Sequence, residues 1–314
     1  MSHEVESMFS VKETPWHGLG KIIQDAPSIQ DGIRLAGLDW TAEVEPLYCA
    51  DSTMVTHRAI RSSTDKRVLG IVGPDYTPLQ NAEAFDWFQP FIDNKLASLT
   101  TAGSLRNGER VWVLAEINFD PSEIVKGDDI RKFILLSNGH DGKLAVRIGF
   151  TPIRVVCANT LRMSHVSEAS KLIRVRHNKG VKASVEKLRE VMNLANQEFE
   201  ATAEQYRFLA KSQFRKDDVI KYVKKMFDIK DSDVVSTKTA NILKDVFDKI
   251  YNGLGTDIAG VRGSWWSAYN GFNEYLNYTN GRNSDNRLNS LWFGENDKLN
   301  AKALELAIEF ANAA

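Results

Sequence analysis

The first half of the chain reads as short apolar runs separated by turn-forming residues. β-branched and aromatic residues concentrate in segments 43–50, 54–60 and 67–73, and Gly, Pro, Asp and Ser cluster between them. Short runs of this composition, bounded by turn residues, are typical of strands. The pattern therefore predicts a β-rich segment between about Thr41 and Val72.

Two later pairs of runs predict β-hairpins. Segments 96–105 and 110–119 flank an Asn-Gly pair, and segments 132–138 and 143–150 flank an Asp-Gly pair. Both dipeptides favour tight turns because their residues accept positive φ. In the last of these segments, alternation predicts that one face of the strand carries Leu144, Val146 and Ile148 and the other Lys143, Ala145 and Arg147.

The segment RVVCANTLRM, residues 154–163, extends this antiparallel meander. Val155 to Cys157 form a run typical of a buried strand, and free cysteine is among the most often buried residue types. Asn159 and Thr160 are predicted to form the polar turn that ends the strand.

A helix is predicted between the two β regions, over residues 77–93. Ala84, Phe85, Phe88 and Phe91 are spaced as one buried helical stripe. Pro90 is expected to kink or end this helix, because proline lacks the backbone N–H and its ring clashes with the preceding turn.

The second half of the chain has helical periodicity. From about Lys182, apolar positions step alternately by three and four residues, which predicts one amphipathic helix of about 30 residues. Further helices are predicted over 216–229, 237–255, 264–279 and 300–314. The register consists of Val185, Leu188, Met192, Ala195, Phe199, Thr202, Tyr206 and Leu209.

The predicted fold is α+β. Residues 1–180 would form a domain with an antiparallel sheet of hairpins and packed helices, and residues 181–314 a helical region that packs on it or mediates oligomerisation. Composition agrees with a globular protein, since 43% of the 314 residues are hydrophobic and 26% are charged. We expect a cytoplasmic protein, because no apolar run is long enough to cross a bilayer and no signal-peptide pattern opens the chain.

Charge is distributed unevenly along a chain whose formal net charge is −1. Between Lys143 and Arg189, eleven Lys and Arg residues stand against two acids, whereas the first fifty residues hold eight acids and three bases. Such asymmetry points to an anionic partner. The alternative is a solvated charged face that acids from elsewhere in the fold neutralise.

The basic segment supplies the candidate site residues. An extended 171–182 segment would place Arg174 and Arg176 on one face, where they could neutralise phosphates without reading bases. In helix 264–279, Trp265, Tyr269, Phe272 and Leu276 form a stripe typical of a core, whereas Trp266 and Tyr278 could serve as platforms for bases. The residues predicted to contact nucleic acid are Arg147, Arg154, Arg162, Lys171, Arg174, Arg176, His177, Lys179, Lys182 and Trp266.

Signals for catalysis are weak. Cys157 has His140, His165 and His177 nearby in the sequence, but it lies in a strand-like run without the surroundings that activate a thiol. The histidines show no metal-ligand spacing, and no phosphate-binding loop is found. The two cysteines, Cys49 and Cys157, give no disulfide framework. We expect neither a metal nor a cofactor.

Six ordered motifs together resemble a family of phage and plasmid proteins built around a domain of unknown function. They are PWHGLG, VGPDYTPLQNAEAF, GSLRNGERVWVLAEI, LLSNGHDGKLAVRIGFTPIRVVCANTL, VRHNKG and WWSAYNGFNEYLNY. One departure is that Asn178 follows the histidine of the fifth motif, where a threonine is expected. The resemblance implies a mobile element, often near replication and recombination genes, and it transfers no catalytic residue.

Three functional hypotheses follow. The first is a non-enzymatic nucleic-acid-binding protein that binds or anneals single-stranded DNA in recombination or replication, as a homo-oligomer. In the second, an oligomeric scaffold or host-defence antagonist binds protein partners through the helix at 185–209. The third and weakest is an enzyme that uses Cys157 with a nearby histidine.

Overall fold

The structure, a computed structural model, describes residues 5–12, 20–118, 120–154, 159–160, 173–187, 192–230, 232–281 and 287–313. The chain forms two compact units, each assembled from separate segments. Unit 1 comprises residues 1–119, 133–150 and 171–195, and unit 2 comprises residues 120–132, 151–170 and 196–314. The units therefore do not follow one cut at residue 180, and the division into independent domains stays a prediction.

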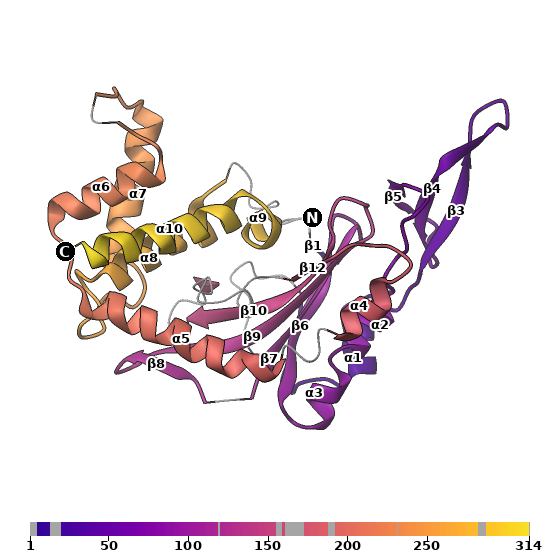
Figure 1. Ribbon diagram of the computed structural model, residues 1–314, viewed down its shortest axis with the longest axis horizontal. Coiled ribbons are helices and arrows are strands. Elements are labelled where there is room, and N and C mark those ends of the chain that lie inside the picture. Colours follow the sequence, from indigo (N-terminus) through magenta and orange to yellow (C-terminus); the bar gives the residue numbers. More distant parts are fainter. Residues whose placement is uncertain are drawn as a thin grey trace. The chain divides into compact units, whose positions relative to one another are not determined.

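The main sheet contains nine strands within the described part of the chain. Their order is β11-β10-β9-β7-β6-β1-β2, with β12 paired to β10 and β8 paired to β9 (Figure 1). The pairings with a described register are antiparallel except that of β1 with β2. The strands are β1 (Val5–Val11), β2 (Lys21–Ile23), β6 (Ala97–Leu105), β7 (Arg110–Ile117), β8 (Ser122–Val125), β9 (Asp128–Gly139), β10 (Val146–Arg154), β11 (Asn159–Thr160) and β12 (Ile173–Val175).

Both predicted hairpins of the main sheet are confirmed. In the β6–β7 turn, Arg106, Asn107 and Gly108 all have positive φ. The turn between β9 and β10 places Gly142 at φ 73°. The Asn-Gly and Asp-Gly signals therefore located the turns correctly, because each supplies a residue that accepts this conformation at low cost.

The prediction for the end of the meander is wrong in one respect. Asn159 and Thr160 form strand β11 and pair with Arg154 and Ile153 of β10, so they do not form a turn. Backbone pairing at the sheet edge overrides the turn preference of Asn here. Cys157 lies outside the described residues.

A second sheet of three antiparallel strands belongs to unit 1. It consists of β3 (Ala42–Tyr48), β4 (Met54–Ser62) and β5 (Val68–Val72), in that order, which confirms the three predicted strands. The β3–β4 hairpin extends away from the other strands of unit 1 (Figure 1).

Short helices of unit 1 pack on strands β6 and β7. The predicted 77–93 helix is divided into α2 (Asn81–Asp86) and α3 (Gln89–Asp93), with Pro90 in the first turn of α3. The four predicted core positions 84, 85, 88 and 91 are buried. Pro90 thus starts a new helix, because its ring excludes continuation of the preceding one.

Three elements of unit 1 were not predicted. Strand β1 lies in the polar N-terminal stretch, yet Met8 and Phe9 are buried where it pairs with β6. Strand β2 adds to its other edge, and helix α1 (Ile29–Leu35) begins at Ser28, whose side chain accepts a hydrogen bond from the Asp31 N–H. A fourth element, helix α4 (Val181–Lys187), follows β12 and falls within the helix predicted from about Lys182.

Unit 2 contains the predicted C-terminal helices. The four predicted segments are confirmed, Gly253 caps α7, and α9 is an additional helix. Within the described residues no helix is both long and apolar enough to cross a membrane. The elements are α5 (Met192–Lys211), which begins at the end of unit 1, α6 (Lys216–Met226), α7 (Thr237–Asn252), α8 (Trp265–Glu274), the π-helical turn η4 (Tyr275–Thr279), α9 (Arg287–Phe293) and α10 (Glu295–Asn312).

The heptad-like stripe is a packing face. Helices α4 and α5 flank residues 188–191, which lie outside the described part of the chain, so one continuous helix stays a prediction. Where the stripe's side chains are described, at positions 185, 199, 202, 206 and 209, they are at most 2% exposed. These positions are therefore used inside the protein and leave no open surface for a partner.

Helix α8 is buried on every side. All residues from Trp265 to Asn273 are buried, and so is Leu276 in η4, which confirms the four predicted core positions. Trp266 is fully buried as well, donates a hydrogen bond from Nε1 to Asp128 Oδ2 at 2.8 Å and packs against Tyr206. The expectation that Trp266 is available as a platform for bases is therefore wrong.

Candidate nucleic-acid interface

A basic face lies on the β10–β12 pair of unit 1. Arg147 is directly opposite Arg174 in the antiparallel register, so their side chains share one face of the sheet. Val146 and Ile148 point to the other face and are buried, as the alternation predicts. Two arginines opposite each other repel by a few tenths of a kcal/mol to about 1 kcal/mol. The register therefore places two positive charges together on this face.

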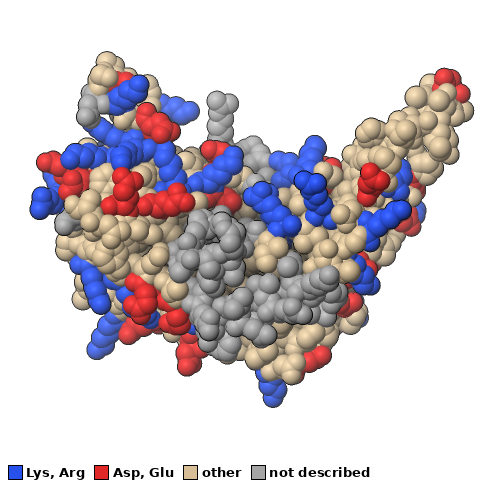
Figure 2. Space-filling model, in the orientation of Figure 1, with Lys and Arg blue, Asp and Glu red and all other residues tan. Residues whose placement is uncertain are grey.

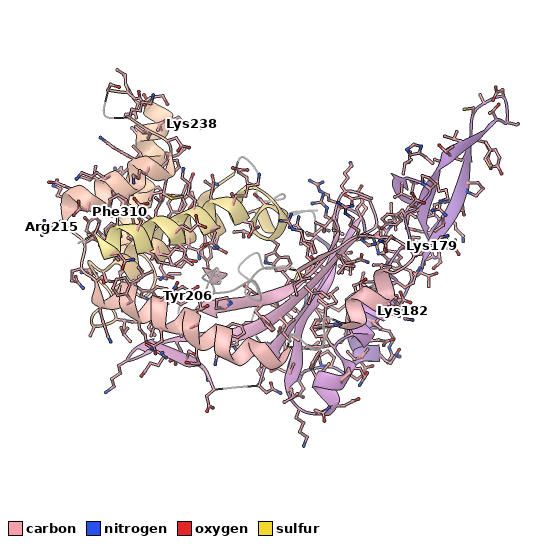
Figure 3. The ribbon with its side chains drawn as sticks, viewed as in Figure 1. Lys179, Lys182, Tyr206, Arg215, Lys238 and Phe310 are labelled. Carbon is pink, nitrogen blue, oxygen red and sulfur yellow. The ribbon has the colours of Figure 1, made fainter. Side chains whose placement is uncertain are left out.

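The loop after β12 continues the basic face. Arg174, Arg176, Lys179 and Lys182 are exposed along β12, the loop and the first turn of α4. Figure 3 labels the two lysines, and Figure 2 shows Lys and Arg side chains gathered where Figure 1 places β12 and this loop. We call Arg147, Arg174, Arg176, Lys179 and Lys182 the basic strip.

Local hydrogen bonds shape the turn that carries Lys179. The Asn178 N–H donates to the Arg176 carbonyl at 3.0 Å, and Asn178 Oδ1 accepts from the Gly180 N–H at 3.0 Å. Asn is well suited to this turn because its side chain can bond the backbone two residues ahead. A threonine hydroxyl could accept the same bond, so the departure noted in the sequence leaves the turn intact.

His177 anchors the loop to the segment that precedes α2. Its ring stacks on Tyr76 with centroids 4.6 Å apart, and its Nδ1 lies 3.2 Å from the Thr77 carbonyl oxygen. The Thr77 N–H in turn donates to the His177 carbonyl at 3.2 Å. Burial lowers the pKa of His177. This histidine is therefore neutral at pH 7, with Nδ1 as the donor to Thr77.

Tyr76 links the same loop to the β9–β10 turn. Its hydroxyl donates to the Gly139 carbonyl at 2.6 Å. Burial, together with the nearby charge of Asp141, raises the pKa of Tyr76, so the phenol stays protonated and remains a donor. Three separate parts of the sequence thus meet around one phenol ring.

Behind this contact lies a buried polar cluster with a defined proton arrangement. Asn81 Nδ2 donates to the Leu38 and Trp40 carbonyls, both at 3.2 Å, so its Oδ1 must face His140 Nε2 at 3.1 Å. His140 therefore carries its proton on Nε2. It is fully buried, and burial lowers its pKa to about 3. Its ring also packs against Trp40.

The β9–β10 turn is fixed by charge and by close backbone packing. Asp141 is buried, forms an ion pair with Arg110 at 3.3 Å and accepts the Lys143 N–H at 2.9 Å. Strand β5 approaches so closely that a Cβ at Gly70 would lie 2.6 Å from the Asp141 Cα. The turn that receives the Tyr76 hydroxyl is therefore held from two sides.

Helix α4 is anchored at its own end of the loop. Trp87 is buried and donates from Nε1 to the Val185 carbonyl at 2.9 Å, and Lys182 pairs with Glu83 at 3.1 Å. The loop is thus fastened at His177 and again in α4. The backbone that presents Lys179 is therefore held at two points, which reduces the ordering that a contact at this loop would require.

One sequence comparison identifies the family of the chain. A family model described as a domain of unknown function, DUF932, matches residues 68–292, well over half of the chain. The chain belongs to the DUF932 family. Neither the search of curated proteins nor the search of solved structures found a match. The DUF932 match contains the basic strip, Tyr76 and the His140 cluster, whereas the β3–β4 hairpin lies before it.

The predicted site residues fall into three groups. Unit 1 brings together Arg147, Arg174, Arg176, His177, Lys179 and Lys182, although His177 acts as an anchor. Arg154 is the last residue of β10, in the part assigned to unit 2, and its side chain is not among those described. Arg162 and Lys171 lie outside the described residues altogether. Trp266 belongs to the core of unit 2.

Sequence reasoning missed the residues that support the strip. Tyr76, Asn81, His140 and Asp141 all lie in two of the motifs that carry the family resemblance. Concentration of Asn, His, Asp and Tyr in otherwise apolar motifs was the signal that could have indicated a buried polar cluster. No group of three or more His, Cys, Asp or Glu side chains suited to a metal ion occurs within the described residues.

Proposed function

We propose that this protein is a non-enzymatic nucleic-acid-binding protein that binds single-stranded DNA through the basic strip. The observation that supports this most directly is the row of four exposed Lys and Arg side chains along β12, the loop and α4. Arg147 lies opposite Arg174 on the neighbouring strand. Lys and Arg in such a run neutralise consecutive phosphates. Anchoring at His177 and Trp87 pre-orders the backbone that presents them.

A single strand suits the site better than a duplex. Proteins that bind single strands combine phosphate contacts with aromatic surfaces on which bases stack. The half-buried Tyr76–His177 pair lies directly beside Arg176 and takes the place that the sequence suggested for Trp266. We propose that a base packs on this pair while the strip binds the backbone.

Fluorescence anisotropy with a labelled 30-nucleotide strand tests the proposal. Phosphate contacts by Arg174, Arg176 and Lys179 alone predict that log affinity falls with log salt concentration with a slope of about −2, because each contact contributes about 0.7 on single strands. Absence of binding at low salt, or affinity that does not change with salt, would contradict it. A duplex of the same sequence tests the preference for single strands.

The biological setting is part of the same proposal. We place the protein in phages, plasmids or integrated elements, acting in the host cytoplasm during recombination or replication. Homo-oligomers would align strips from several subunits on one strand and so promote annealing of complementary strands. Sedimentation with and without oligonucleotide measures this assembly.

A protein-interaction role is the second candidate, supported by the β3–β4 hairpin. Tyr48 and Met54 form a cross-strand pair near its tip and are 60% and 67% exposed. Exposed apolar side chains of this size often mark protein contacts. If this role is correct, a Tyr48→Ser, Met54→Ser variant should lose its protein partner and an Arg174→Glu, Arg176→Glu variant should keep it. For DNA binding, the hairpin variant should keep its affinity and the arginine variant should lose it.

A further inference from the structure

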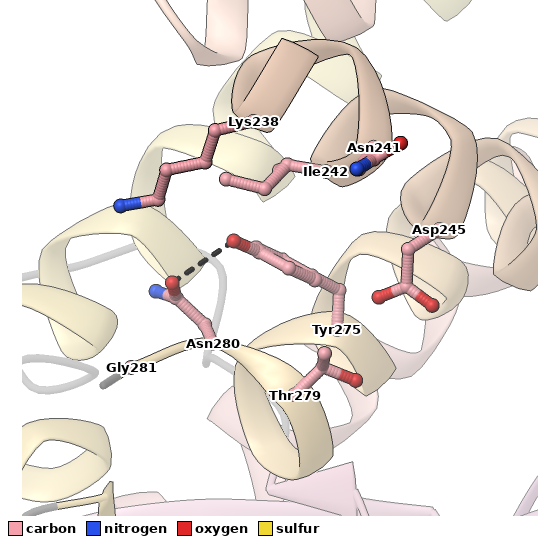
Figure 4. Close-up of a pocket in the computed structure, with 8 residues that line it drawn as sticks. All are labelled: Lys238, Asn241, Ile242, Asp245, Tyr275, Thr279, Asn280 and Gly281. Carbon is pink, nitrogen blue, oxygen red and sulfur yellow. Dashed lines mark hydrogen bonds between the residues drawn. The ribbon is translucent and has the colours of Figure 1, made fainter. Parts of the chain in front are cut away.

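A cavity in unit 2 is not used by the proposed function. It has a volume of about 700 Å³ and lies between α7 and the π-helical turn η4 (Figure 4). Small-molecule sites commonly have volumes in the range of several hundred Å³. π-helical turns are rare and often occur at functional sites.

The walls of this cavity are held by close helix packing. Gly271 of α8 lies so near α7 that a Cβ there would be 2.5 Å from the Ile250 backbone. Helix α8 continues into η4, so this contact fixes the position of η4 against α7. The polar groups on the two walls are therefore presented at set positions.

One end of the cavity is suited to an anion. The Lys238 side chain extends above the Tyr275 hydroxyl, and Asn280 lies below it (Figure 4). Tyr275 donates to Asn280 Oδ1 at 2.9 Å, and Asn280 Nδ2 donates to Asn296 Oδ1 at 2.8 Å, which fixes the amide. Burial raises the pKa of Tyr275, so its hydroxyl keeps its proton. The ammonium of Lys238 is the charge at this end.

The other end is suited to a hydrogen-bond donor. Asp245 Oδ1 accepts from Lys249 at 2.6 Å. Asp245 Oδ2 is buried and has no hydrogen-bond partner among the described residues. A buried acceptor without a donor is unfavourable, and the Asp245 side chain is one-third exposed as a whole. A small rotation of the carboxylate would turn this oxygen toward the cavity, where a ligand N–H would donate to a charged group.

We propose that this cavity binds a small amphoteric molecule, a nucleoside monophosphate whose base carries an amino group. The phosphate would bind at Lys238, the amino group would donate to Asp245 Oδ2, and the ring would lie along Ile242 and Tyr275. A free amino acid also combines an anionic group with an N–H donor, but it would leave most of the volume empty. The site is independent of the basic strip.

Isothermal titration of the full-length protein with cytidine monophosphate tests the site. We expect saturable binding, with cytidine at least about tenfold weaker because it lacks the phosphate that pairs with Lys238. Absence of saturation at roughly 5 mM, a ligand concentration that would detect even millimolar affinity, would overturn the proposal. Equal affinity for cytidine would overturn the assignment of the anionic end.

Matched variants on α7 separate the site from general effects of charge. Lys238→Gln should weaken binding about tenfold, whereas Lys244→Gln makes the same charge change on the same helix and should leave affinity unchanged. Asp245→Asn should weaken binding at least about fivefold compared with Asp248→Asn. Equal effects within either pair would contradict the site. Circular dichroism of each variant confirms that it is folded.

Discussion

The basic strip of unit 1 and the α8 core of unit 2 use aromatic and polar residues in opposite ways. In unit 1, Tyr76 and His177 are half-buried and hold a charged loop at the surface. In unit 2, Trp266 and Tyr269 are fully buried, and their polar atoms bond inside the core. Residue type alone therefore does not indicate a binding surface, and the difference lies in what surrounds each ring.

The largest effect is expected from Trp266→Ala. This change removes a fully buried indole and leaves the Asp128 carboxylate without its N–H donor, so we expect a loss of about 3–5 kcal/mol in the free energy of unfolding. Chemical denaturation followed by circular dichroism measures it. A loss below about 1 kcal/mol would show that the ring is not a core residue.

Charge reversal in the basic strip should lower the affinity for single-stranded DNA and leave the stability of the fold almost unchanged. Arg174→Glu with Arg176→Glu is expected to weaken binding to single-stranded DNA about 100-fold, because two phosphate contacts become repulsive. Unfolding free energy should change by less than about 0.5 kcal/mol. The matched control is Lys221→Glu with Lys298→Glu, which reverses the charge of two exposed lysines of unit 2. If the control weakens binding equally, general charge and not the strip explains the affinity.

The buried His140 should make unit 1 sensitive to acid. Its pKa in the folded protein, about 3, lies below its ordinary value of 6.5, so between these values the unfolded state binds a proton that the folded state does not. The contribution of His140 to the free energy of unfolding should therefore be constant above about pH 6.5. Below that pH it should fall by up to about 1.4 kcal/mol per pH unit. Urea unfolding at pH 7, 6 and 5 measures the slope.

The control for this slope is His140→Gln. Glutamine at this position does not titrate. The free energy of unfolding of the variant should therefore change with pH less steeply, by up to about 1.4 kcal/mol per pH unit, whatever its value at pH 7. His177, whose pKa is also lowered by burial, contributes in the same direction and remains in both proteins. Identical slopes for the two proteins would contradict the buried, neutral state of His140.

The smallest effect is expected from Tyr76→Phe. The ring stack on His177 is kept and only the hydrogen bond to the Gly139 carbonyl is lost, so we expect about 1 kcal/mol of destabilisation. Tyr76→Ala should in addition weaken binding to single-stranded DNA several-fold, because the loop loses its stacking partner. Anisotropy on the two variants side by side distinguishes the hydrogen bond from the ring.

Most of the fold was predictable because its signals are local. The alternation in 143–150, the Asn-Gly and Asp-Gly turns and the helical spacing in 216–229 are each contained within a few residues. Strand β1 was missed because its burial depends on pairing with β6, about 90 residues later. Local pattern carries no information about such a partner.

The site was predictable only in its charges. The surplus of Lys and Arg is visible in composition, but the buried cluster joins Asn81, His140 and Tyr76 across long stretches of chain. The error at Trp266 has a related cause. The stripe argument assumes a helix with one buried face, whereas α8 is enclosed on all sides, so its polar residues are buried as well.

The bond from the Thr77 N–H to the His177 carbonyl also gives the loop a kinetic reporter. An amide exchanges its hydrogen with solvent only while its hydrogen bond is open, so the exchange rate of Thr77 measures how often the loop lifts from the segment before α2. That opening free energy is a property of the unliganded protein. A ligand that binds only the closed loop raises the ratio of closed to open forms. The exchange rate of the Thr77 amide must then fall by the same factor.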